Sequence, residues 1–267
     1  MRYGYFFLSA LLISGCESDN DNELQEEDVR SVIDHAHASM VLLPVYPLIR
    51  ALQAGDAPWV TMGSRTCAVV DSIVGDTVAF PNAGDVTVYL RYPSGGCTDV
   101  DGRIREGNLV VVFASSVGVG PGSFSAYSGN FGASGFTSRF GMHGNANAAV
   151  QEVELDSSFI WQAGAWSRRI SGSMAYSVVE GNLTMEPDDD EYTLTHVLTG
   201  KDRSGASYSA NTSEALSVGT TCRWTRSGME IILPDGLGQR ILDHGAGACD
   251  GASAITAGGQ TIGLTIP

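Results

Sequence analysis

A long succession of short apolar runs, separated by turn residues, constrains the fold of this chain more than any other feature. The runs begin after Trp59 and include residues 66–74, 85–91, 108–113, 173–179, 192–198 and 229–233. Apolar residues in them alternate with polar ones or form β-branched stretches, and turns such as Asp101-Gly102 and Asp235-Gly236 follow at regular spacing. This pattern is typical of antiparallel β proteins. We therefore predict a mainly β domain over 59–267, built as a twisted antiparallel sheet or as a half-open barrel or sandwich.

One of these runs carries a further expectation. Residues 109–113 are apolar at every position, which predicts a strand that is covered on both faces, by a second layer or by a helix. A helical segment is predicted upstream, over 29–58, because Val29, Val32 and Ala36 recur at helical spacing. Pro44 and Pro47 interrupt it.

The amino terminus predicts export. Arg2 precedes a short apolar run that ends in Ile13-Ser14-Gly15-Cys16, and this resembles a bacterial lipobox, in which the cysteine thiol is acylated and the cysteine becomes the first residue of the mature chain when residues 1–15 are removed. The alternative is a plain signal peptide with an incidental cysteine. Residues 16–28 are strongly acidic and predict a solvated tether. Glu17 is not the aspartate of the inner-membrane retention signal, so we expect an outer-membrane anchor, on the periplasmic or the cell-surface face.

The net charge of the chain argues against two classes of binding partner. The formal net charge of -15 argues against nucleic acid, which needs a basic surface, and against electrostatic adhesion to anionic lipid. Membrane attachment would then depend on the acyl chains at Cys16. Beyond the signal we expect no apolar run that approaches the roughly 18 residues of a membrane helix.

Four cysteines remain if Cys16 carries lipid: Cys67, Cys97, Cys222 and Cys249. In an exported chain an even number predicts two disulfides, with three possible pairings. A zinc site is the alternative, but no cysteine or histidine pair has ligand spacing.

A repeat favours one of these pairings. Thr66-Cys67 lies thirty residues before Cys97, and Thr221-Cys222 lies twenty-seven before Cys249. Leu90 corresponds to Leu242, Gly95 to Gly247, and Asp101-Gly102 to Asp250-Gly251. We therefore interpret 66–117 and 221–267 as related units, each with a strand, a cysteine, two hairpins, a second cysteine and a strand. This symmetry favours Cys67–Cys97 and Cys222–Cys249, and chance similarity among hairpins is the alternative.

The segment from Val86 to Val111, with its Gly96-Cys97 and Asp101-Gly102-Arg103 turn, resembles uncharacterised lipoproteins of Bacteroidota-type bacteria. The ending Leu242-Asp243-His244-Gly245 with Cys249-Asp250 is similar to the same family. The resemblance implies an envelope lipoprotein and no particular activity.

No catalytic motif is found. The chain has no nucleophile elbow, phosphate loop or zinc-protease motif, and Asp99 to Asn108 does not fit a calcium loop, so we read that segment as a hairpin turn. His35 and His37 would lie on different faces of a helix and are expected to be solvated or partly packed. His143 and His196 have no visible partner, and Asp243 and His244 would point to opposite faces of a strand. We predict no catalytic residue, no metal ligand and no cofactor.

Five aromatic residues in the glycine-rich stretch 118–144 allow two interpretations: Phe124, Tyr127, Phe131, Phe136 and Phe140. They could form a glycan-stacking surface, or pack over glycines of the sheet, which is the commoner arrangement. The sequence therefore predicts a membrane-anchored envelope lipoprotein that acts as a binding or structural module, with a lipid or glycan as possible ligand. The alternative function is a hydrolase of envelope glycans.

Overall fold

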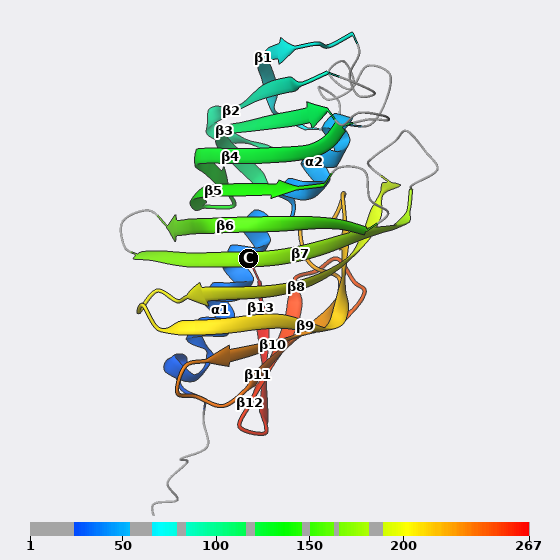
Figure 1. The fold of residues 1–267 in the computed structure, drawn as a ribbon. Helices are drawn as coiled ribbons and strands as arrows, with labels where there is room; N and C mark the ends of the chain where they lie inside the picture. Colours follow the sequence, from blue (N-terminus) through cyan, green and yellow to red (C-terminus); the bar gives the residue numbers. More distant parts are fainter. Residues whose placement is uncertain are drawn as a thin grey trace, which may run out of the picture.

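The fold is a single antiparallel meander sheet with two helices packed against it, seen in a computed structural model that describes residues 24–53, 66–78, 84–115, 121–145, 150–162, 166–181 and 189–266 (Figure 1). Within these residues thirteen strands form one sheet that is not closed, and each strand pairs with its neighbours in sequence. The strands are β1 Val69–Gly75, β2 Val86–Thr98, β3 Ile104–Ser115, β4 Pro121–Ala133, β5 Phe136–Gly144, β6 Val150–Gln162, β7 Trp166–Glu180, β8 Glu191–Lys201, β9 Ser207–Gly219, β10 Ser227–Pro234, β11 Arg240–Ala246, β12 Ala252–Ala257 and β13 Gln260–Thr265. The predicted mainly β fold is confirmed, as one open sheet rather than a sandwich.

Helix α1 covers Glu26–Leu42 and α2 covers Val45–Gln53. The helix begins earlier than the predicted residue 29 because Glu26, Glu27 and Asp28 occupy its first turn, where carboxylates suit the positive end of the helix dipole. The Asp28 carboxylate also accepts a 3.1 Å hydrogen bond from the Gln25 amide. Pro44 lies between the helices, and Pro47 lies in the first turn of α2, where its missing N–H costs nothing.

The helices lie against one face of the sheet, with α1 crossing the middle strands (Figure 1). Helix α1 contacts β7 and also β10, β11 and β12, so the carboxyl-terminal strands curl around it. The stretch Glu26–Leu52 is long and apolar enough, by length and composition, to cross a membrane, contrary to the expectation from sequence. However, 78% of its most apolar window is buried, as in the core helix of a folded domain.

Alternation along the strands places one set of side chains against the helices. On β3, Leu109, Val111 and Phe113 are fully buried, while Val110 and Val112 on the other face are half-buried. The expectation that this strand is covered on both faces was therefore wrong. On the outer face Val110 lies between its cross-strand partners Tyr89 and Tyr127, so apolar contact with aromatic neighbours accounts for an apolar residue there.

The aromatic residues of 118–144 belong mainly to the core. Phe124, Phe131, Phe136 and Phe140 are buried, and only Tyr127 among the five is exposed. The Phe124 ring lies over its cross-strand partner Gly144, where a Cβ would be within 2.9 Å of the ring. Packing over a strand glycine is thus confirmed for Phe124, and the buried phenylalanines cannot stack on a glycan.

Both disulfides join the cysteines that the repeat pairs. Cys67 and Cys97 have Cα atoms 5.9 Å apart, and those of Cys222 and Cys249 are 5.8 Å apart. The first bridge ties the start of β1 to the end of β2, and the second ties the chain before β10 to the chain after β11. Each closes one hairpin instead of the two that were expected, and each is followed by an Asp-Gly turn and a further strand.

Candidate functional site

A pocket opens between the two helices and the place where the two disulfide-containing units approach each other. Its cavity volume is about 80 Å³, and its empty space including the open mouth is about 900 Å³. Apolar residues of α1, α2 and the chain between them form one wall, and the chain from β9 to β10 with the end of β13 forms the other. The principal apolar lining residues are Ala36, Met40, Leu43, Pro47, Leu48, Ala51, Val218, Trp224 and Ile266.

The turn between β2 and β3 supplies a charged wall. Asp99 and Asp101 both bind Arg105, whose Nη2 lies 2.7 Å from Asp101 Oδ2, and Arg103 also pairs with Asp101. All four side chains are buried. Burial opposes ionisation of Asp101, but the positive charges of Arg105 and Arg103 outweigh it and lower the pKa of this carboxyl. The predicted hairpin turn is present, and it holds a buried ion-pair network.

Arg103, which lines the pocket, also links its two sides. Its Nη2 donates to the backbone carbonyl of Arg223, so the unit at the amino end of the sheet contacts the unit at the other end. The Arg223 guanidinium lies 4.1 Å from the Trp224 ring centroid, and the Trp224 indole donates a 2.8 Å hydrogen bond to the Ile266 carbonyl. The Nε atoms of Arg103 and Arg223 are buried and find no hydrogen-bond partner among the described residues.

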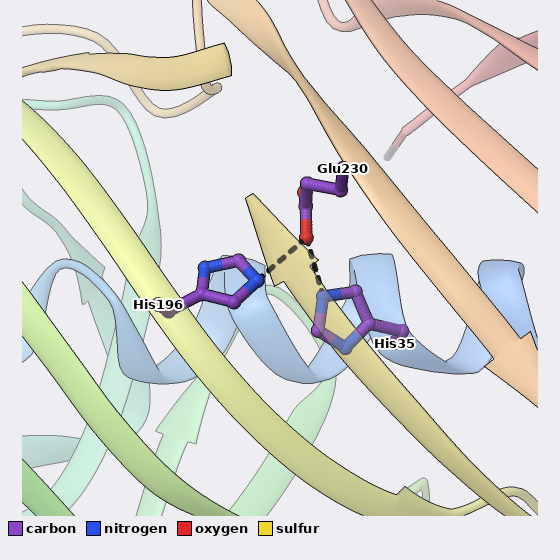
Figure 2. Close-up of side chains that lie close together, drawn as sticks. All are labelled: His35, His196 and Glu230. Carbon is purple, nitrogen blue, oxygen red and sulfur yellow. Dashed lines mark hydrogen bonds and ion pairs between the residues drawn. The ribbon is translucent and has the colours of Figure 1, made fainter. Parts of the chain in front are cut away.

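Below the pocket, three histidines surround one glutamate in the core. Glu230 comes from β10, His35 from α1, His196 from β8 and His244 from β11. Nε2 of His35 lies 2.6 Å from Glu230 Oε2, and Nε2 of His244 lies 2.6 Å from Oε1. Nε2 of His196 lies 3.0 Å from Oε2, as an ion pair that is not aligned as a hydrogen bond. Figure 2 shows the His35 and His196 rings converging on the same carboxylate oxygen.

The cluster is fully enclosed. His35 and Glu230 are 0% and 1% exposed, and His196 and His244 are 3% and 5% exposed. Burial would raise the pKa of Glu230, but the charges of His35 and His196, with the hydrogen bond from His244, hold it well below its ordinary value. Glu230 is therefore an anion that is surrounded by three imidazoles.

A second buried network links α1 to the sheet. Asp34 Oδ1 lies 2.8 Å from Arg168 Nε and 3.0 Å from Arg203 Nη2, and the Arg203 amide donates to Asp34 Oδ2 at 2.7 Å. Burial lowers the pKa of Arg168, but the adjacent carboxylate keeps the guanidinium charged. The amino-terminal helix is thus held to β7 and to the turn after β8 by charge as well as by apolar contact.

Two expectations about histidines were wrong. His35 is fully buried rather than solvated or partly packed, and His196 has a partner in Glu230 from another strand. His244 contacts the same glutamate. His35, His196 and Glu230 also place one donor atom each within 4.8 Å of one another, a spacing that a metal ion could use. Cys16 and the signal region lie outside the described residues. No local spacing could have revealed the cluster, because Glu230 lies 195 residues from His35 in sequence.

Comparisons with models of protein families, with curated proteins and with solved structures find no match to this chain.

Proposed function

We propose that this protein is a lipid-anchored module of the cell envelope whose pocket binds a small molecule with an apolar chain and an acidic end. Cys16 would carry the acyl chains, with the acidic segment after it as a tether at the outer membrane. The two disulfides support export, because such bonds persist mainly in oxidising compartments.

The observation that carries the ligand proposal is the combination of an apolar lining with unused arginine donors. Ala36, Met40 and Leu48 offer apolar contact to a hydrocarbon chain. The buried Nε donors of Arg103 and Arg223 need an acceptor, and a carboxylate supplies one. Three arginines and two aspartates in this wall leave one positive charge, although the chain as a whole is strongly acidic.

The glycan hydrolase has less support. Such enzymes need one carboxyl group that can be protonated near neutral pH. Asp99 and Asp101 both lie in the pocket wall, but Arg105 binds both, and the pKa of Asp101 is lowered. Neither carboxylate has the environment of a general acid.

Anchoring is tested by labelling cells with palmitate. We expect label on the wild-type chain and none on the variant Cys16→Ser. Label that persists on Cys16→Ser, or an unlabelled wild type, would contradict the lipid anchor.

Ligand binding is tested by native mass spectrometry of the protein from its own host and by displacement of a fluorescent fatty acid. Ala51 lines the pocket and Ala215 is exposed on β9. We expect Ala51→Trp to weaken fatty-acid binding about tenfold or more by filling the pocket, and the control Ala215→Trp to leave it unchanged.

The end group is tested with the matching fatty alcohol, which should bind more weakly than the acid because it lacks the charge.

Each of these tests has an outcome that contradicts the proposal. Equal binding of the fatty acid by Ala51→Trp and wild type would show that the pocket is not the site. Equal binding of acid and alcohol would contradict the role of the arginines.

A further inference from the structure

We propose that His35, His196, His244 and Glu230 form a binding site for one divalent transition-metal ion. Each side chain comes from a different element, so the fold and not a local motif assembles the donor set. Nε2 of each histidine faces the carboxylate, at 2.6 Å for His35 and His244 and 3.0 Å for His196. With bonds of about 2.1 Å, neighbouring donors around a metal stand about 3–3.5 Å apart. His35, His196 and Glu230 already place one donor atom each within 4.8 Å of one another, so small side-chain rotations open these three around an ion. His244 contacts the other carboxylate oxygen and has to turn toward the ion to complete the set.

The donor types select the class of metal. Three imidazoles and one carboxylate suit zinc and the neighbouring metals iron, cobalt and nickel. Calcium and magnesium prefer a shell of oxygen ligands, and a single glutamate does not provide one. The site therefore fits a first-row transition ion.

Without an ion, the cluster leaves buried polar atoms without hydrogen-bond partners. This energetic cost argues that the cluster does more than fill the core. The Nδ1 atoms of His35, His196 and His244 are buried without a hydrogen-bond partner among the described residues. Neutral imidazoles that donate through Nε2 leave these atoms as unpaired acceptors, and protonated imidazoles leave them as unpaired donors. Either state carries the desolvation penalty of a buried polar atom that makes no hydrogen bond. Apolar side chains of similar size would fill this part of the core at lower cost.

An entry path is also present. His244 lines the pocket together with Ser39, whose Oγ lies 3.3 Å from His35 Nε2. The pocket thus approaches the donor set from the side of α1 and β11. An ion can reach the cluster by that route, although the four side chains are almost fully buried.

The experiment uses the full chain in detergent, freed of metal with a chelator and titrated with Co²⁺ or Zn²⁺. We expect one Co²⁺ per chain, visible absorption typical of nitrogen and oxygen ligation, and a higher unfolding temperature with Zn²⁺ because binding stabilises the folded state. His196→Gln should weaken Zn²⁺ binding about a hundredfold or more, beyond the 10–100-fold typical of residues that only support ligands. His143→Gln is the control, since His143 is exposed and lies outside the cluster.

A ligand exchange separates coordination from a structural role. In His244→Cys the new thiolate should add a sulfur-to-cobalt charge-transfer band in the near ultraviolet, which a packing role would not produce. This readout holds even if His196→Gln folds poorly. A wild-type chain that takes up no Co²⁺ would overturn the proposal. Equal affinities in His143→Gln and His196→Gln, or a His244→Cys spectrum without the new band, would also overturn it.

Discussion

Charged residues in the core form networks in which each member depends on its partners. Asp101 and Arg105 are both almost fully buried, and each compensates the charge of the other. Removing one partner of such a pair leaves an uncompensated buried charge, which costs more than the pair contributes. The same reasoning applies to Asp34 with Arg168 under the middle of the sheet.

Asp101 gives a prediction about pH. Its folded-state pKa lies below the ordinary 3.8, so its ion pairs stabilise the fold above that pH and are lost as the pH falls through the folded-state value. We expect Asp101→Asn to lower the free energy of unfolding by about 3 kcal/mol at pH 7. The difference from wild type should shrink below pH 4. Urea unfolding at pH 7, 5, 4 and 3 measures it.

The control for this series is Glu214→Gln, at an exposed position of β9. It should follow the wild-type curve at every pH. A destabilisation by Asp101→Asn that stays constant from pH 7 to pH 3 would show that Asp101 does not stabilise the protein through its charge.

At the scale of secondary structure, a glycine in β3 allows a bulge where the strand bends. Gly107 in β3 has a φ of 86°, and a Cβ there would lie 2.0 Å from the carbonyl oxygen of Asn130 in β4. The pairing of β3 with β4 shifts register between Glu106 and Val110, beside this glycine. Such bulges bend a strand and increase its twist. Gly107 therefore helps turn the charged end of β2 and β3 toward the pocket.

We expect Gly107→Ala to destabilise the protein by about 2 kcal/mol or more, because alanine meets both backbone strain and the Asn130 carbonyl. Gly129→Ala is the matched control on β4, where a Cβ would meet nothing within 4 Å and φ is not positive. Chemical denaturation of the two variants makes the comparison. Similar losses of stability in both variants would mean that the strained backbone at the bulge does not cause the destabilisation by Gly107→Ala.

For the whole molecule, α1 is the element around which the sheet curls. Its contacts with β7 and with β10 to β12 bring together strands from distant parts of the sheet. Three buried or partly buried charges of the sheet, Arg168, Glu230 and Arg240, have partners on this helix in Asp34, His35 and Asp28. The sheet without α1 would expose its apolar face and leave these charges without those partners.

A chain that begins at residue 66 should therefore lose cooperative unfolding and bind hydrophobic dyes. A chain that begins at residue 24 keeps α1 and should unfold as the full chain does. Differential scanning calorimetry and dye fluorescence measure both. A sharp unfolding transition of the shorter chain, at the temperature of the longer one, would show that the sheet does not need the helix.

The sequence alone determined the class of the fold, the presence of a helical segment before the sheet and the pairing of the cysteines. Alternation of apolar residues, turn dipeptides and helical spacing are local signals, and the cysteine repeat needed only a comparison of two segments. The sequence could not determine that the sheet stays a single open layer around α1. It also could not determine that His35, His196 and His244 meet Glu230. Those contacts depend on the curvature of the whole sheet, which the described residues build from thirteen paired strands. That curvature accumulates from many small twists and bulges, and no short stretch of residues encodes it.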